Sequence, residues 1–345
     1  MRATVGALKT SATMSGTAVT PGSQVTHRAQ VPPGSVRGFG GEVRHYLTQR
    51  PRQLPSHYLY DDLGSALFEA ICRLPWYPLT RAEMRLLESH AHEIIDAGVT
   101  AIVELGPGSG AKLSGLLAGA ANDRGPLDLH LVDVSGSALA EAARALEGHR
   151  DIRIVPHRTT YEIGLERFGG ARTGAGRRLA LFLGSNIGNF DPPGRDVILK
   201  AMRASLARGD GLLLGVDLVK PVPDLLLAYD DPIGVTAAFN LNLLDRINRE
   251  LEGDFDLFGF AHRALWNEAH SRIEMHLRSL RRQRIHVRGA DLTFVMEPDE
   301  TIWTESSYKY RPTEILAMLE RAGFRVRSQW IEPVDRFALT LAEAV

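Results

Sequence analysis

Hydrophobic and polar positions divide the chain into segments of different period. After Thr80 and Glu83, apolar residues recur at helical spacing, which predicts a capping box and an amphipathic helix that ends at Gly98. Short apolar runs then alternate with helical patterns, and these runs are AIVEL, LDLHLVDV, IRIVP, LALFLGS and GLLLGVDLV. Strand, helix and strand in repeated order require crossover connections, and hence a parallel sheet covered on both faces. The pattern predicts a doubly wound α/β fold.

The alternation stops at Asp217, where a second kind of pattern begins. From there to Tyr310 the chain reads as helices followed by β-rich segments, and after Arg311 a helix and two strands can complete the first sheet. We therefore expect an inserted α+β substrate-binding domain from residues 41–79 and 217–310. The sheet domain, which would bind the cofactor, comprises residues 80–216 and 311–345. Residues 1–40 are rich in Ser, Thr, Gly, Pro and Ala, so we expect a disordered extension there.

Composition narrows the classes of partner. The 345 residues contain 40 Lys and Arg against 41 Asp and Glu, with no basic excess for nucleic acid or an anionic membrane. No apolar run approaches the roughly 20 residues of a membrane span. Cys72 is the single cysteine, which excludes an internal disulfide and a cysteine-rich metal site. Neither the pair His90 and His92 nor the later histidines have ligand spacing. We expect a cytoplasmic monomer that binds a small molecule and no metal, nucleic acid or membrane.

A glycine-rich turn carries the strongest local signal. Glu104, Gly106, Gly108 and Gly110 stand at the end of a predicted strand and open a helix. Small residues let the backbone approach a ligand, and the helix N-terminus offers unpaired N–H groups. An acid before the first glycine is typical of class I S-adenosylmethionine-dependent methyltransferases, whereas dinucleotide enzymes usually lack it. Asp133 ends the next strand, where a carboxylate can bind ribose hydroxyls, and we favour this role over that of a helix cap.

Two further polar segments follow predicted strands. Gly184 to Asn189 comes directly after LALFL, so Asn189 can face the crevice at the carboxyl edge of the sheet, although the segment could also be only a turn. In the run from Thr304 to Lys309, period-two alternation places Glu305 and Ser307 on one face. A carboxylate beside a hydroxyl can hold a ring with N–H groups, while the alternative is a solvated edge strand.

Together these segments resemble the L-histidine Nα-methyltransferases of ergothioneine biosynthesis. The resemblance runs from about Tyr58 to the C-terminus and rests on YLYDDLGSALFEAICRLP, WYPLTRAE, IVELG, LFLGSNIGNF, LLLGVDLVK, LLAYDDPIGVTAAFN, RINRELEGDFD, RIEM and TESSYKYRP. It implies a class I methyltransferase (Rossmann-like) fold with an inserted α+β substrate-binding domain. It also implies trimethylation of L-histidine to hercynine, with S-adenosyl-L-methionine as methyl donor and S-adenosyl-L-homocysteine as product.

The resemblance also implies roles for individual residues. Tyr60 and Asn189 become the candidate catalytic residues, and the candidate substrate-binding residues are Tyr77, Asn189, Tyr229, Met275, Glu305 and Ser307. The candidate cofactor-binding residues are Glu104, Gly106, Gly108, Gly110, Lys112, Asp133, Thr160, Tyr161 and Gly184. Thr160 and Tyr161 stand where the family generally has Asp and Phe near the adenine, and Asn186 stands where a threonine is common.

Two alternatives remain open on the sequence. The chain could methylate the α-amino group of another aromatic amino acid, such as tryptophan. It could also be a binding protein that retains the fold without turnover. The residues at positions 305 and 307 favour histidine, because they can address both ring nitrogens, whereas an indole offers one donor and no acceptor.

Overall fold

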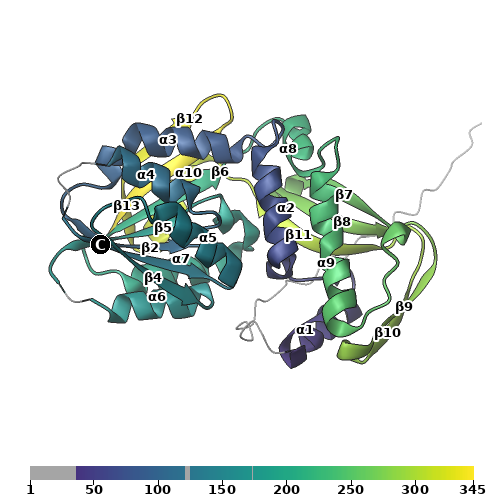
Figure 1. Cartoon of the computed structure of the whole chain (residues 1–345). Helices are drawn as coiled ribbons and strands as arrows, with labels where there is room; N and C mark the ends of the chain where they lie inside the picture. Colours follow the sequence, from purple (N-terminus) through teal and green to yellow (C-terminus); the bar gives the residue numbers. More distant parts are fainter. Residues whose placement is uncertain (1–35, 121–124, 173) are drawn as a thin grey trace, which may run out of the picture.

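The computed structural model describes residues 36–120, 125–172 and 174–345. Figure 1 shows two adjoining bodies, a large one around a seven-stranded sheet and a smaller one around a four-stranded sheet. The disordered extension expected at residues 1–40 lies, for residues 1–35, outside the described residues. Residues 36–40 open helix α1 (Val36–Thr48), so this part of the expectation is wrong. Among the described helices, none has the length and apolar character that a membrane crossing requires.

The large sheet has the strand order β12-β13-β6-β5-β2-β3-β4. Its strands are β2 (Val99–Leu105), β3 (Leu127–Asp133), β4 (Ile152–Arg158), β5 (Arg177–Phe182), β6 (Gly211–Asp217), β12 (Phe324–Glu332) and β13 (Phe337–Ala344). Neighbours among the strands β2 to β6 pair in parallel, whereas β13 runs antiparallel to both of its neighbours. The parallel core predicted from the apolar runs is confirmed, and so is its completion by the last two strands.

Helices cover both faces of this sheet, as the doubly wound pattern predicts. One face packs against α3 (Leu79–Ile94), α4 (Ala111–Gly119) and α5 (Gly136–Leu146), and the other packs against α6 (Tyr161–Gly170), α7 (Pro192–Ser205) and α10 (Pro312–Arg321). The central strands are buried on both sides, because each carries apolar residues in both directions. The sheet is therefore a rigid support for groups at its edges.

The capping box predicted at the start of α3 is wrong. The helix begins at Leu79, its N-cap is Pro78, and no side chain caps it. Glu83 is fully buried instead, and both of its carboxylate oxygens lie 2.9 Å from the backbone nitrogen of Gly184. A buried carboxylate needs donors, and those donors lie on the neighbouring loop rather than at the helix end.

The smaller body combines an N-terminal and a central segment of the chain. Its sheet has the order β1-β11-β8-β7, and a separate hairpin pairs β9 with β10. The strands are β1 (Arg52–Gln53), β7 (Phe260–Asn267), β8 (Arg272–Ser279), β9 (Gln283–Val287), β10 (Leu292–Met296) and β11 (Thr301–Tyr308). The longer helices are α1, α2 (Asp62–Arg73), α8 (Val222–Tyr229) and α9 (Val235–Leu251). The helices and the following β-rich region predicted after Asp217 are confirmed, with α9 lying across β7 and β8 beside α2.

The two bodies meet where β6 and β11 end. Leu218 and Tyr310 form a parallel bridge, and the backbone nitrogen of Val219 donates to the carbonyl oxygen of Tyr310 over 3.0 Å. This bridge places Asp217, the last residue of β6, next to Lys309. The carboxyl edge of the large sheet thereby faces the smaller body, the position in which open α/β sheets bind ligands.

Candidate functional site

The turn between β2 and α4 brings backbone close to its neighbours. Gly106, Gly108 and Gly110 have φ angles of 67°, 54° and 76°, in the left-handed region that favours glycine. A Cβ atom on Gly106 would lie 2.7 Å from the Tyr161 hydroxyl oxygen, and one on Gly110 would lie 2.7 Å from Cα of Ala142. The glycine turn predicted from the sequence is confirmed. A side chain at Gly106 or Gly110 would collide with the neighbouring residues.

Two acidic side chains, Glu104 and Glu83, are buried near this turn. Glu104 is 1% exposed, and within the described part of the chain its Oε2 atom has no hydrogen-bond partner. Burial raises the pKa of Glu104 to about 8, with Lys112 lowering it and Glu83 raising it further. The Lys112 ammonium lies 2.9 Å from Oε2 of Glu83. A buried carboxylate oxygen without a partner is a place where a ligand donor fits.

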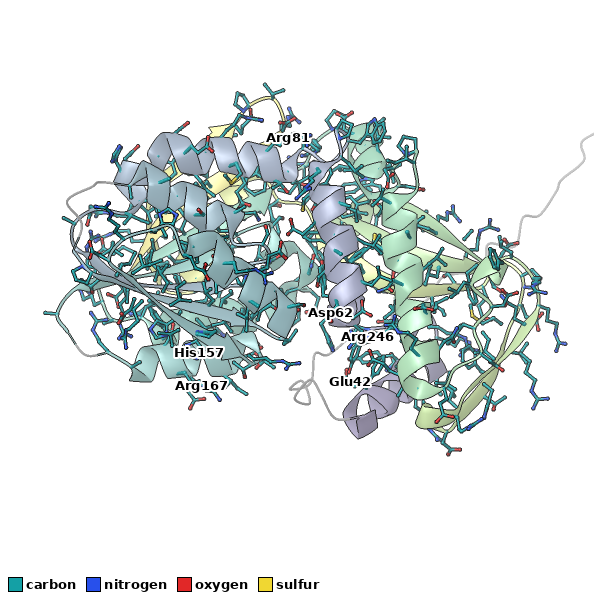
Figure 2. The ribbon with its side chains drawn as sticks, in the orientation of Figure 1. Glu42, Asp62, Arg81, His157, Arg167 and Arg246 are labelled. Atoms are coloured by element: carbon teal, nitrogen blue, oxygen red, sulfur yellow. The ribbon has the colours of Figure 1, made fainter. Side chains whose placement is uncertain are left out.

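A cleft opens between the glycine turn and the smaller body. From the large sheet it is lined by Gly106, Gly108, Asp133, Thr160 and Tyr161. Asp133 ends β3, where burial raises the pKa of its carboxyl group, and Oδ1 accepts from the backbone nitrogen of Ser135 over 2.8 Å. The smaller body contributes residues that include Glu42, Tyr60, Asp62 and Phe68, and Figure 2 labels Glu42 and Asp62 on this side.

Some predicted cofactor residues lie outside the lining of this cleft. Gly110 packs against α5, Glu104 is buried, and Lys112 pairs with Glu83. Gly184 has a φ angle of 72° and lines a second pocket, described next. Gly110 would therefore shape the turn, whereas Lys112 reaches the Gly184 loop, where a Cβ atom would lie 2.8 Å from its ammonium nitrogen.

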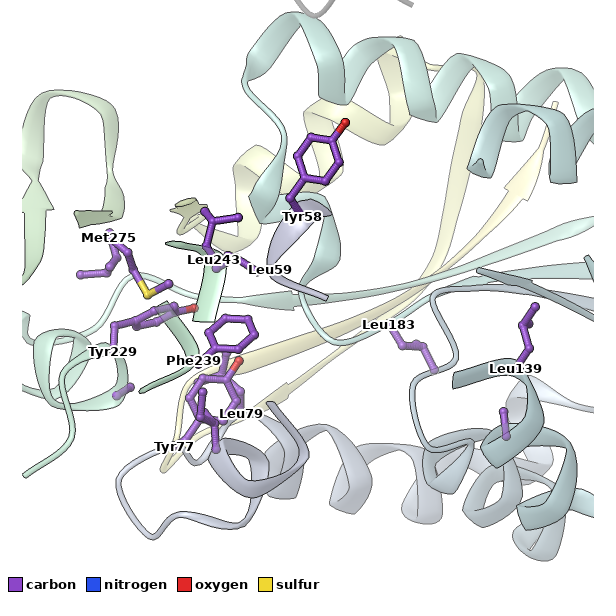
Figure 3. Close-up of a cluster of buried hydrophobic side chains, with 14 of the residues drawn as sticks. Tyr58, Leu59, Tyr77, Leu79, Leu139, Leu183, Tyr229, Phe239, Leu243 and Met275 are labelled. Atoms are coloured by element: carbon purple, nitrogen blue, oxygen red, sulfur yellow. The ribbon is translucent and has the colours of Figure 1, made fainter. Parts of the chain in front are cut away.

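The second pocket lies between the carboxyl edge of the large sheet and the four-stranded sheet. It brings together every predicted catalytic and substrate-binding residue, from six separate segments: Tyr60, Tyr77, Asn189, Tyr229, Met275, Glu305 and Ser307. Figure 3 shows Tyr77, Tyr229 and Phe239 gathered near Met275. Tyr60, Phe68, Asn186 and Asn189 line both this pocket and the cleft. The two spaces therefore adjoin.

The pocket is closed enough to change the ionisation of its groups. Glu305 is 8% exposed, and burial raises the pKa of its carboxyl group to about 7, against the lowering influence of Lys309. Burial also raises the pKa of Tyr60 and of Tyr77 well above the ordinary value of a phenol. Both tyrosines therefore stay protonated at neutral pH.

Sequence reasoning missed several residues of this site. The Lys309 ammonium donates to the Tyr229 hydroxyl over 2.8 Å and to Oγ of Ser307 over 2.9 Å, and it pairs with Asp217 at 2.8 Å. A signal for Lys309 existed, because lysine occurs only at positions 9, 112, 200, 220 and 309. Phe68 and Phe239, which line the pocket, carried no signal that separates them from core residues.

His90 and His262 take part in packing and hydrogen bonding. The ring of His90 stacks on Trp330, with centroids 4.3 Å apart, and His262 lies 2.8 Å from the Tyr229 carbonyl oxygen. Across residues 36–120, 125–172 and 174–345, the structure contains no group of three or more His, Cys, Asp or Glu side chains suited to a metal ion.

The sheet topology, the glycine turn with its buried acid and the adjoining cleft are those of a Rossmann-like class I methyltransferase fold. A family model described as "Histidine-specific methyltransferase, SAM-dependent" matches residues 39–344. The chain belongs to this family of histidine-specific, S-adenosylmethionine-dependent methyltransferases.

Relatives of named function align with most of the chain. It is 42% identical over 304 residues to the histidine N-alpha-methyltransferase of Mycolicibacterium smegmatis, covering 87% of this chain and 93% of the relative. The histidine N-alpha-methyltransferase of Mycobacterium tuberculosis shows the same identity and coverage. Ergothioneine biosynthesis protein 1 of Neurospora crassa is 28% identical over 289 residues, which cover 81% of this chain and 32% of that protein.

Proposed function

We propose that the protein methylates the α-amino nitrogen of L-histidine, with S-adenosyl-L-methionine as donor, and adds three methyl groups to give hercynine in ergothioneine biosynthesis. The observation that carries the proposal is the convergence of seven predicted catalytic and substrate-binding residues on one pocket that adjoins the cofactor cleft. In this reading the substrate domain comprises residues 41–79 and 217–310, and the cofactor domain comprises 80–216 and 311–345. The protein would act in the cytoplasm as a monomer.

The cleft fits a nucleoside that carries an amino-acid tail. Asp133 supplies a carboxylate for two ribose hydroxyls, and Thr160 and Tyr161 would border the adenine. The unpartnered Oε2 of Glu104 can accept from an ammonium group, while Lys112 can pair with a carboxylate. Gly106, Gly108 and Gly110 keep the turn free of side chains, and Gly184 continues this surface toward the substrate. The cofactor would supply an electrophilic methyl group on a sulfonium, leave as S-adenosyl-L-homocysteine and require no metal.

The second pocket has complementary groups for each part of histidine. Tyr77 and Tyr229 present hydroxyls for the carboxylate, and Asn189 can both donate to and accept from neighbouring groups at the amine. Glu305 and Ser307 would hold the imidazole ring, packed against Met275, which is 1% exposed. Anchors at both ends of the substrate keep the amine in one place through successive methylations, and positioning of this kind can supply much of the rate.

Tyr60 would orient the amine rather than remove its proton as a phenolate. Burial holds its pKa far above neutrality, so its hydroxyl is a neutral donor and acceptor. Its ring packs edge-on against Phe68 and Phe239, which fixes the hydroxyl at the border of the cleft and the pocket. Asn189 lines the same border, and together these two side chains would aim the nitrogen lone pair at the methyl group. Before each transfer the ammonium would lose one proton to solvent, because the nearby sulfonium charge lowers its pKa. The transfer would then form a C–N bond and break the C–S bond of the sulfonium.

A product assay tests the proposal. The protein is incubated with S-adenosyl-L-methionine and each proteinogenic amino acid separately, and products are identified by mass spectrometry. We expect histidine to gain three methyl groups and tryptophan to gain none. Methylation of tryptophan in place of histidine would assign the protein to that substrate. Calorimetric binding of histidine and S-adenosyl-L-homocysteine without any methylated product would make it a non-catalytic binding protein.

A further inference from the structure

A fully buried lysine stands behind the substrate pocket. Lys309 and Asp217 both have side chains with 0% exposure, and their charged atoms lie 2.8 Å apart. Asp217 has a second cationic partner, Lys220, at 2.7 Å. Two lysines for one carboxylate leave one net positive charge in this buried group. Lys220 alone can neutralise Asp217, so Lys309 is not needed for that purpose. Because burying the charge of Lys309 costs free energy, Lys309 must have another role.

The hydrogen bonds of Lys309 go to two hydroxyl groups of the pocket. An ammonium group has three donors and no acceptor. It donates to the hydroxyl oxygens of Tyr229 and Ser307, and it forms an ion pair with Asp217. Because the Lys309 side chain is 0% exposed, it does not face a substrate directly, and its effect on the substrate passes through the two hydroxyls.

The hydroxyls of Tyr229 and Ser307 also contact each other, at 2.8 Å. Each oxygen accepts one hydrogen bond from Lys309, and their mutual contact consumes one hydroxyl proton and one acceptor position. The pair is left with one free proton and one free acceptor position. Two arrangements are therefore possible. If Ser307 donates to Tyr229, Tyr229 can donate to a ligand and Ser307 can accept from one. If Tyr229 donates to Ser307, the two roles are exchanged.

We propose that Lys309 is a positioning residue that orders this pair, so that Ser307 donates to Tyr229, Tyr229 donates to the substrate carboxylate, and Ser307 accepts a ring N–H. This inference rests on the proposed function, which places the carboxylate near Tyr229 and the ring near Ser307. A carboxylate accepts but does not donate, so it selects the arrangement in which Tyr229 offers the proton. The net positive charge behind the pair favours the same anion.

The first test compares two lysine variants that share Asp217. Lys309→Met keeps the length of the side chain and removes all donors. Lys220→Met is the matched control, because Lys220 pairs with the same carboxylate and otherwise donates to the Asp335 carbonyl oxygen. Both variants should unfold at a lower temperature. The dissociation constant of histidine, measured by calorimetry with S-adenosyl-L-homocysteine present, should rise at least about tenfold in Lys309→Met alone. Unchanged affinity in that variant, or an equal loss in both, would overturn the proposal.

The second test reads the direction of the proton chain and does not need a folded Lys309 variant. Tyr229→Phe should weaken histidine binding about tenfold or more and leave binding of histamine, which lacks the carboxylate, nearly unchanged. Equal losses for the two ligands, or no loss for either, would contradict the proposed direction. A wild-type protein that neither binds nor methylates histidine would overturn the proposed function and this inference together. If the wild-type protein methylates histidine but Lys309→Met binds histidine with unchanged affinity, only this inference is overturned.

Discussion

Both carboxylate oxygens of Glu83 lie 2.9 Å from the backbone nitrogen of Gly184, so helix α3 holds the loop that follows β5. The same carboxylate pairs with Lys112 at the start of α4. One buried side chain thus joins the start of α4 to the loop that follows β5. Under the proposed function, a substitution there should affect both stability and cofactor binding.

We expect Glu83→Gln to lower the free energy of unfolding by about 2 kcal/mol, because a neutral amide cannot compensate Lys112. The same variant should raise the KM for S-adenosyl-L-methionine, since Lys112 loses its fixed position. Chemical denaturation and steady-state kinetics measure the two effects. Glu88→Gln, on the exposed side of the same helix, should match the wild type in both. If Glu83→Gln is as stable as the wild type and has normal kinetics, the ion pair between Glu83 and Lys112 has no structural role.

Gly106→Ala should separate cofactor binding from backbone strain. Its φ angle of 67° costs a residue with a Cβ atom about 1 kcal/mol, and the added atom would meet Tyr161 and Asn186, which line the cleft. Gly234 has a similar φ angle of 80° and open space at its Cβ position. We expect Gly106→Ala to lose at least as much stability as Gly234→Ala, and only Gly106→Ala to lose affinity for S-adenosyl-L-homocysteine in a calorimetric titration of the folded protein. Equal affinities would remove the turn from the cofactor site.

Glu305→Ala should change substrate choice. Removal of the buried carboxylate deprives the ring of a charged partner, so kcat/KM for histidine should fall by about 10- to 100-fold, while larger aromatic amino acids should gain activity. Ser306→Ala is the control, because Ser306 points to the opposite face of β11 and does not line the substrate pocket. Competition assays with histidine and tryptophan measure the preference. Histidine kinetics that stay unchanged in Glu305→Ala would remove this residue from the substrate site.

Stability should fall as pH rises through the range in which Glu104 retains its proton only in the folded state. The folded pKa is about 8, whereas the unfolded group titrates near 4.5. Between these pH values the unfolded chain binds fewer protons at this group than the folded protein does. The contribution of Glu104 to the free energy of unfolding is therefore fully present below about pH 4.5 and lost by about pH 8. Thermal unfolding of the ligand-free protein across this range should show a shallower decline for Glu104→Gln than for the wild type. Identical slopes would contradict the raised pKa. Glu305 titrates in the same direction, so a part of the decline should remain.

The features that could be predicted from the sequence are those that depend on residues close together in the chain. Apolar runs located the strands of the large sheet, and glycines with a preceding acid located the cofactor turn, because both signals lie within about ten residues. Glu83 was misjudged because a local capping pattern competed with a partner 101 positions away in the chain. The contact between Tyr229 and Ser307 spans 78 positions, and only the fold brings them together. The family resemblance supplied the pocket residues. The scarcity of lysine was a signal for Lys309, whereas its burial and its contacts with Tyr229 and Ser307 required coordinates.

A substitution of Asn189 should affect catalysis without affecting stability. It lies at the end of the short helix η2 (Asn186–Asn189) and lines both the cleft and the substrate pocket. In the described part of the chain, no protein group is hydrogen-bonded to its side-chain amide, which leaves this amide available for a ligand. Asn189→Ala should therefore retain the wild-type unfolding temperature while kcat/KM for histidine falls by about 10-fold or more.

Asn248 provides the matched comparison for this prediction. Its side-chain amide donates to the carbonyl oxygen of Phe255 over 2.8 Å and accepts from the backbone nitrogen of the same residue over 2.9 Å. Asn248→Ala should therefore lower the free energy of unfolding by about 1 to 3 kcal/mol and leave the kinetics of the folded protein unchanged. Thermal unfolding and initial rates measured on both variants give the comparison. If Asn189→Ala loses stability as Asn248→Ala does, and its activity falls only in proportion to the unfolded fraction, Asn189 holds the fold and does not orient the amine.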